Sequence, residues 1–93
     1  MSFLRIYELV AISGRQEELR DALDDLANAV REIDGCQSVE FFRDSEAPAR
    51  HLFIERWIGR DAWVAGKPPK PVFQRLLSVS AGPPTLVGAF FPA

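Results

Sequence analysis

Cysteine and histidine are almost absent from this sequence, which contains one of each, Cys36 and His51. A single cysteine cannot form an internal disulfide, and one cysteine with one histidine falls short of the usual ligand set of a zinc site. We therefore expect no metal centre and no disulfide-stabilised fold. A reducing, cytoplasmic setting fits this cysteine usage best.

Other signals are missing as well. The net charge is -2, with 11 basic and 13 acidic residues dispersed along the chain, so we expect no nucleic-acid partner. The 6 glycines form neither a phosphate-binding loop nor a dinucleotide-binding pattern, so no nicotinamide, flavin or ATP cofactor is implied. No segment has the roughly 20 apolar residues of a membrane span, and the N-terminus lacks the pattern of a signal peptide.

What is present fits one globular domain spanning residues 1–93, with 47% hydrophobic and 26% charged residues. A chain of this length buries a limited share of its surface, so a second copy would add stability by association.

Alternating strand-like and helix-like patterns predict an order of elements. The first strand is expected over 3–12, and Ser13 with Gln16 forms a capping box that would begin a helix. Gly35 suits the left-handed residue that ends this helix. Its apolar stripe comprises Leu19, Leu23, Leu26, Val30 and Ile33, with Ala22 and Ala29 beside it. The later elements are strands over 36–44 and 50–58 joined as a hairpin, helices over 60–65 and 72–79, and a strand over 85–91.

This order predicts an α+β, ferredoxin-like βαββαβ fold with a four-stranded antiparallel sheet and both main helices on one face. The strands carry apolar residues on both faces, so the uncovered face needs a partner. Even positions of the first and third strands are mainly aliphatic, whereas odd positions mix aromatic and charged residues. We therefore expect the odd face to lie away from the helices, covered by a second copy, with a cavity near Trp57 in each subunit.

Candidate chemistry gathers around the corner where the third strand ends and the short helix begins. Glu55 could accept a proton if a cavity raised its pKa, or it could pair with Arg5 on the first strand. His51 could also accept a proton, or it could be an exposed histidine at a strand start. Tyr7 and Trp57 fit either an interface core or a platform for an aromatic substrate.

Two further features near this corner have alternative interpretations. Trp63 could close a pocket from the short helix, or it could simply bury that helix against the sheet. Lys67 and Lys70 lie among prolines and are either solvated loop charges or a lid over an anionic ligand.

Several short motifs run through the chain: Ser13-Gly14-Arg15 with Glu17 and Leu19 after it, Gly35-Cys36, Glu55-Arg56-Trp57 and Asp61-Ala62-Trp63. With these motifs the chain resembles the antibiotic biosynthesis monooxygenase (ABM) family over nearly its whole length. The resemblance implies a homodimer that forms a dimeric α/β barrel. It also implies oxidation of phenolic or quinol-type substrates by molecular oxygen without metal or flavin, which requires a base and a dry aromatic cavity.

The sequence departs from the resemblance where many members carry histidine. Those positions correspond here to Gly66 and to the Lys70-Pro71 region. The Asn, Trp and His of haem-degrading relatives correspond to Tyr7, Gly66 and Leu76, which disfavours haem degradation.

The leading hypothesis is an ABM-like homodimer that oxygenates a small phenol, quinol or anthrone without a cofactor. The alternative is a small-molecule-binding or structural dimer of the same fold, and haem binding is a third possibility. The predicted catalytic residues are Glu55, His51 and Tyr7. The predicted substrate-binding residues are Arg5, Phe42, Phe53, Trp57, Trp63 and Phe73.

Overall fold

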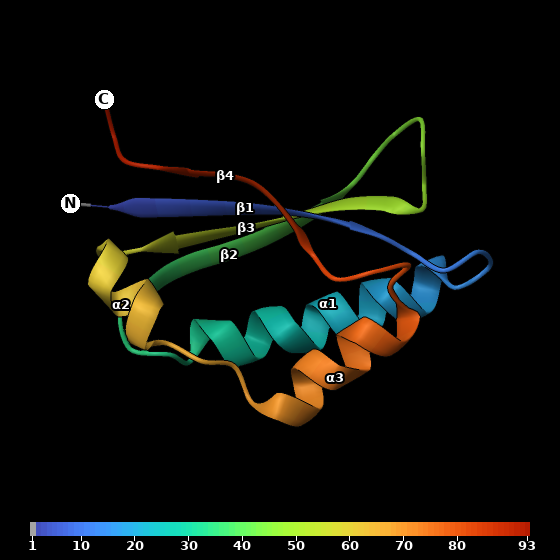
Figure 1. Cartoon of the computed structure of the whole chain (residues 1–93), viewed down its shortest axis with the longest axis horizontal. Coiled ribbons are helices and arrows are strands. Elements are labelled where there is room, and N and C mark those ends of the chain that lie inside the picture. Colours follow the sequence, from blue (N-terminus) through green and yellow to red (C-terminus); the bar gives the residue numbers. More distant parts are fainter. Residues whose placement is uncertain (1) are drawn as a thin grey trace.

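The computed structural model describes residues 2–93 and shows one four-stranded antiparallel sheet with helices against it (Figure 1). The strands are β1 (Phe3–Val10), β2 (Cys36–Arg43), β3 (Arg50–Trp57) and β4 (Thr85–Phe90), in the sheet order β2-β3-β1-β4. The helices are α1 (Gln16–Arg31), α2 (Arg60–Ala65) and α3 (Lys70–Val79). The predicted ferredoxin-like βαββαβ order is confirmed, with α2 as a short additional helix before α3.

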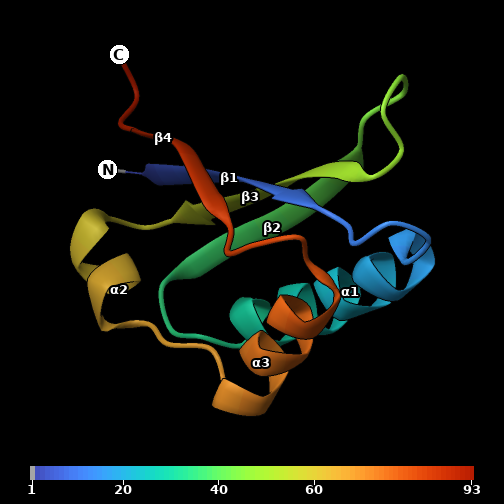
Figure 2. The same cartoon turned by 45° about the vertical axis from the view of Figure 1, so that its right-hand side comes forward.

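The helices all lie on one side of the sheet. Figures 1 and 2 show α1 and α3 side by side below the strands, while α2 lies at the end of the sheet where β3 finishes. The predicted hairpin between β2 and β3 is present, and β1 pairs with both β3 and β4. Within residues 2–93, no helix combines the length and the apolar character needed to cross a membrane.

Helix α1 forms because its apolar residues recur every three or four positions and make one continuous face toward the sheet. The buried residues of this face are Leu19, Ala22, Leu23, Leu26, Ala27 and Val30. The predicted stripe is therefore confirmed with one change, since Ala27 is fully buried where Ala29 is only half-buried. Ile33 lies beyond the last helical residue and packs at the edge of the core.

The predicted capping box is wrong. Helix α1 begins two residues later than a Ser13 cap would place it, with Arg15 at the N-cap and no side-chain cap hydrogen bond. The reason is the preceding turn: Gly14 adopts a φ of 80°, and the Arg15 N–H donates to the carbonyl oxygen of Ile12. This tight turn carries the chain from β1 into the helix without a side-chain cap.

The predicted orientation of the sheet is also wrong, because its odd positions face the helices. Phe3, Leu9, Phe53 and Trp57 are each at most 3% exposed and belong to the single hydrophobic core. These large side chains fill the layer between the sheet and α1, which small residues could not do. The even positions Leu4, Ile6, Leu52 and Ile54 are half-buried on the outer face.

Two polar residues of the odd face were expected to point away from the helices, yet both are buried beneath them. The Nδ1 atom of His51 lies 3.2 Å from the carbonyl oxygen of Ala49, and Glu55 accepts a hydrogen bond from the Trp57 side chain. Burial of a polar group is tolerated when it finds such a partner. These local hydrogen bonds make the burial of both polar residues tolerable, so the odd-numbered side chains can face the helices.

Two glycines with positive φ provide a matched test of the fold. Gly35 has a φ of 89°, and a Cβ built on it would lie 2.6 Å from the Cβ of Ala62; Gly14 has a φ of 80° and open space around it. Both alanine variants lose stability because alanine disfavours the left-handed backbone conformation. In Gly35→Ala the added Cβ also clashes with Ala62, which forces α2 away from the turn before β2. We expect Gly35→Ala to lower the free energy of unfolding by about 1–3 kcal/mol more than Gly14→Ala. Urea unfolding measures both, and equal losses would contradict the close contact.

Candidate functional site

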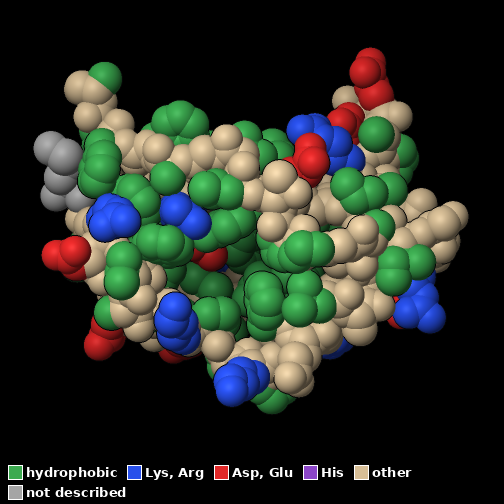
Figure 3. All heavy atoms as spheres, viewed as in Figure 1, with side chains coloured by type: hydrophobic (Ala, Val, Ile, Leu, Met, Phe, Trp, Pro, Cys, Tyr) green, Lys and Arg blue, Asp and Glu red, His purple; other side chains and the backbone are tan. Residues whose placement is uncertain are grey.

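A cavity of about 450 Å³ lies between the inner face of the sheet and the helices. Figure 3 shows it as a hollow in the middle of the surface, lined mostly by hydrophobic side chains. Its volume is within the range of small-molecule sites, and an apolar lining with few polar groups is typical of them. This is the strongest candidate site in the described part of the chain.

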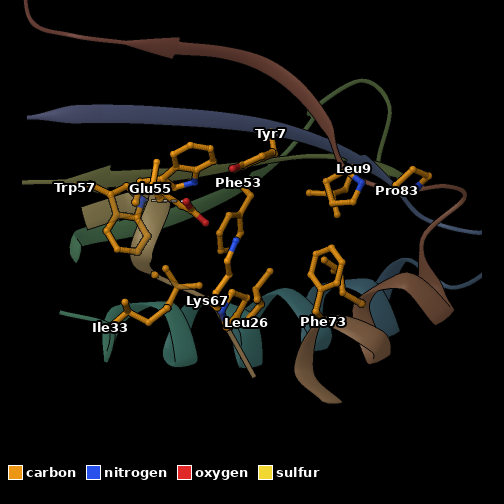
Figure 4. Close-up of a pocket in the computed structure, with 17 residues that line it drawn as sticks. Tyr7, Leu9, Leu26, Ile33, Phe53, Glu55, Trp57, Lys67, Phe73 and Pro83 are labelled. Atoms are coloured by element: carbon orange, nitrogen blue, oxygen red, sulfur yellow. Dashed lines mark hydrogen bonds between the residues drawn. The ribbon is translucent and has the colours of Figure 1, made fainter. Parts of the chain in front are cut away.

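Each structural layer contributes one wall of the cavity (Figure 4). The sheet supplies Tyr7, Leu9, Phe53, Glu55 and Trp57, and the α1 side supplies Leu26, Val30 and Ile33. Helices α2 and α3 add Trp63, Val64, Phe73 and Leu76. The linker between these helices adds Gly66, Lys67 and Pro68, and the turn before β4 adds Pro83 and Pro84.

Glu55 is the only acidic residue that lines the cavity, and its side chain is held in a defined position. It is 8% exposed, and the Nε1–H of Trp57 donates to its Oε1 at 3.0 Å. Burial raises the pKa of Glu55, and this effect is partly opposed by the Trp57 hydrogen bond and by the positive charge of Arg5. A carboxylate with a raised pKa is a stronger base than an ordinary glutamate, so Glu55 is suited to proton abstraction.

Arg5 lies opposite Glu55 in the register of β1 and β3, but its side chain contacts two aromatic residues of the site. Its guanidinium carbon is 3.7 Å from the centroid of the Trp63 ring, and its Nε–H donates to the Tyr7 hydroxyl oxygen at 3.1 Å. The stacking anchors α2 to the sheet through a cation–π contact. Because the Tyr7 oxygen accepts from Arg5, its own O–H is left to donate to a ligand.

The structure brings six of the predicted site residues to the cavity and leaves three outside its lining. The six that line it are Tyr7, Phe53, Glu55, Trp57, Trp63 and Phe73. Arg5 stands behind the lining, in contact with Tyr7 and Trp63. His51 lies on the same face but at the opposite end of β3 from Trp57, and Phe42 points to the outer face, where it is 51% exposed. The structure therefore places neither His51 nor Phe42 at this cavity.

Several lining residues that were not predicted as site residues come from segments without a periodic pattern. Lys67 in the proline-rich linker was interpreted as either a solvated charge or a lid, and the turn before β4 was interpreted as an interruption; both segments form parts of the wall. Gly66 explains one departure from the resemblance, since a Cβ there would lie 2.9 Å from both Ile33 and the ring of Trp57. A histidine at this position would force Ile33 or the Trp57 ring to shift.

The family model described as antibiotic biosynthesis monooxygenase matches residues 3–65, which is more than half of the chain. The chain belongs to the ABM family. The matched span covers β1 through α2 and so includes the Glu55–Trp57 strand end that forms the polar part of the cavity. A comparison with curated proteins finds no match.

Solved structures agree with the ABM fold over nearly the whole chain. A mutant of SnoaB, a cofactor-independent oxygenase from Streptomyces nogalater, has a TM-score of 0.83 at 16% identity, covering 98% of this chain and 92% of that one. Rv0793 from Mycobacterium tuberculosis has a TM-score of 0.81 at 17% identity, with 100% and 96% covered. A protein from Nitrosomonas europaea has a TM-score of 0.86 at 14% identity, with 98% and 89% covered. At these identities the likeness shows the fold.

Proposed function

We propose that this ABM-family protein is a cofactor-independent monooxygenase that acts on a small aromatic substrate of the phenol, quinol or anthrone type. The observation that supports this proposal is a buried carboxylate, Glu55, held by Trp57 inside an otherwise aromatic cavity. The ABM family and the activity named for SnoaB support the same reaction class. With Cys36 as a free thiol, we place this activity in the cytoplasm.

In the proposed reaction, Glu55 takes a proton from the phenolic hydroxyl or the acidic ring CH₂ of the substrate. The resulting anion gives an electron to molecular oxygen, and the two radicals combine in a carbon–oxygen bond. The peroxide anion then takes back the proton held by Glu55 and becomes a hydroperoxide. Loss of water from the hydroperoxide leaves a carbonyl, so that a CH₂ group and O₂ become C=O and H₂O. Proton abstraction is the step for which the protein supplies a group, and the apolar lining of the cavity strengthens the anion's interactions.

The other lining residues position the substrate in this scheme. Phe53, Trp57 and Phe73 offer ring faces and edges against which a planar aromatic molecule can stack. The Tyr7 O–H donates to the oxygen on which negative charge develops, which stabilises the anion. Arg5 fixes Tyr7 in this role through its hydrogen bond to the hydroxyl oxygen.

Oxygen consumption by the purified protein tests the proposed function. We expect uptake with at least one member of a panel of anthrones and hydroquinones, at one O₂ per quinone formed. Binding of panel members without any uptake would support the alternative, a ligand-binding dimer of the same fold. This alternative is favoured by Gly66, which occupies a position where many relatives carry histidine.

The homodimer is part of the same proposal, with the outer, even face of the sheet as its interface. Apolar side chains gather on this face: Leu4, Ile6, Phe42, Leu52, Ile54 and Phe90. Phe42 and Phe90 are 51% and 50% exposed in the single chain, which favours burial against a partner. The cavity itself lies on the other side of the sheet, so each subunit would keep its own site.

Light scattering checks this arrangement. We expect a mass twice the 10.4 kDa of one chain, and a shift to the single-chain mass for Ile54→Glu, because a buried carboxylate would disrupt the interface. Leu77→Glu is the matched control, since Leu77 is a partly exposed residue of α3 on the helical side and should leave the dimer intact. A single-chain mass for the unaltered protein would refute the dimer.

A further inference from the structure

The cavity lining contains two charged residues, and they lie on opposite walls. Glu55 comes from β3 in the sheet, and Lys67 comes from the linker between α2 and α3. Figure 4 shows the Lys67 side chain rising from the linker toward the sheet, into the space that Phe53 and Glu55 face. All other lining residues are apolar or neutral, so these two groups determine the electrostatic character of the cavity.

The two charges differ in their surroundings. Glu55 is buried, whereas Lys67 is solvent-exposed and forms none of the salt bridges found within residues 2–93. Because Pro68 follows Lys67, the backbone at Lys67 is restricted to extended conformations, which limits the directions its side chain can take. The ammonium group is therefore available to a ligand at the mouth of the cavity.

The other cation near the site is already engaged. Arg5 stacks on Trp63 and donates to Tyr7, so its charge is directed to the protein's own aromatic residues. Figure 3 shows Lys and Arg side chains beside the hollow. Lys67 therefore places a positive charge in the lining at the exposed side of the cavity, while the buried side holds the Glu55 carboxylate.

We propose that Lys67 determines substrate specificity by binding an anionic group, a carboxylate, at the end of the aromatic substrate that remains at the cavity mouth. This inference rests on the proposed function, because it assumes an aromatic ring inside the cavity. A carboxylate cannot enter next to ionised Glu55, since two like charges in a poorly solvated site repel each other strongly. The pair of charges therefore orients the substrate, with its hydroxyl or CH₂ end toward Glu55 and its anionic end at Lys67.

A matched pair of ligands tests the inference by calorimetry. The ligand 6-hydroxy-2-naphthoate carries its hydroxyl and carboxylate at opposite ends of the ring system, and 2-naphthol lacks the carboxylate. At low salt we expect the unaltered protein to bind the carboxylate about fivefold more tightly than the neutral ligand, the effect of one exposed charge pair. The preference should shrink as salt is raised, because exposed charges are screened.

Three variants separate the role of Lys67 from a general effect. Lys67→Met should bind both ligands equally, Lys67→Arg should keep the preference, and Lys70→Met should behave as the unaltered protein. Lys70 is the matched control, since it begins α3 in the same basic segment and does not line the cavity. The affinity ratio is the readout, because a merely structural defect would weaken both ligands together.

The outcomes distinguish this inference from the proposed function. Equal binding of the two ligands by the unaltered protein, or a preference that survives in Lys67→Met, would overturn the role of Lys67 and leave the aromatic cavity standing. Failure of both ligands to bind would overturn the aromatic site itself, and the role of Lys67 with it.

Discussion

Glu55→Gln is expected to lower the rate of oxygen uptake by at least about 100-fold while leaving substrate binding intact. The substitution removes the base but keeps the shape of the side chain. The amide oxygen of glutamine can still accept the hydrogen bond from the Trp57 Nε1–H, so the position of Trp57 is preserved. Oxygen-electrode rates and calorimetric binding of the same substrate measure the two effects separately. A variant with the rate of the unaltered protein would exclude Glu55 as the base.

The pH dependence of the unaltered protein provides a second check on Glu55. Its pKa is raised above the usual 4.5 by burial, so the ionised, active form appears at higher pH than for an exposed glutamate. The rate should therefore rise with pH through this elevated pKa. The free energy of unfolding should change with pH in the opposite direction to the rate. The contribution of Glu55 to stability is fully present below its pKa in the unfolded chain and is lost as pH rises through its pKa in the folded protein. Glu55→Gln should remove both dependences.

Trp57→Ala is expected to lower the free energy of unfolding by about 3–5 kcal/mol, because it empties a large, fully buried site. Trp57 is 2% exposed, and its ring is packed against Gly66. For a domain of this length a loss of 3 kcal/mol corresponds to a decrease in Tm of roughly 12–24 °C. Thermal unfolding followed by circular dichroism measures the decrease directly.

Trp63→Ala is the control for this substitution. Trp63 also lines the cavity, but it is half-buried on a short helix and its main contacts are Phe3 and Arg5. We expect a clearly smaller decrease in Tm for Trp63→Ala than for Trp57→Ala. A similar decrease for both would contradict the prediction that the more deeply buried tryptophan contributes more to stability.

The order of elements could be predicted because it depends on local patterns. The period of the apolar residues distinguished α1 from the strands, and glycines and prolines marked most of the boundaries correctly. The orientation of the sheet could not be predicted in the same way, since both faces of β1 and β3 carry apolar side chains. Residue type alone then predicted that the aliphatic even face lies against the core. In the structure the odd face, with its larger aromatic side chains, packs in the core instead.

The candidate site was predictable to the extent that it lies on one strand. Glu55 and Trp57 share a face because they are two residues apart on β3, and alternation along a strand guarantees this. Lys67 reaches the same space only through the path of the linker, which no sequence period describes. The hydrogen bond from Trp57 to Glu55 likewise depends on rotamers that only the packed core selects.

The proline-rich linker has a consequence for how this protein could acquire new substrates. Residues 66–69 connect α2 to α3 and belong to no helix or strand, and three of them, Gly66, Lys67 and Pro68, form part of the cavity wall. Exchanging Lys67 or Pro68 therefore alters the entrance without breaking a hydrogen-bond ladder or opening the core around Leu23. The entrance can therefore diversify while the scaffold that holds Glu55 stays the same.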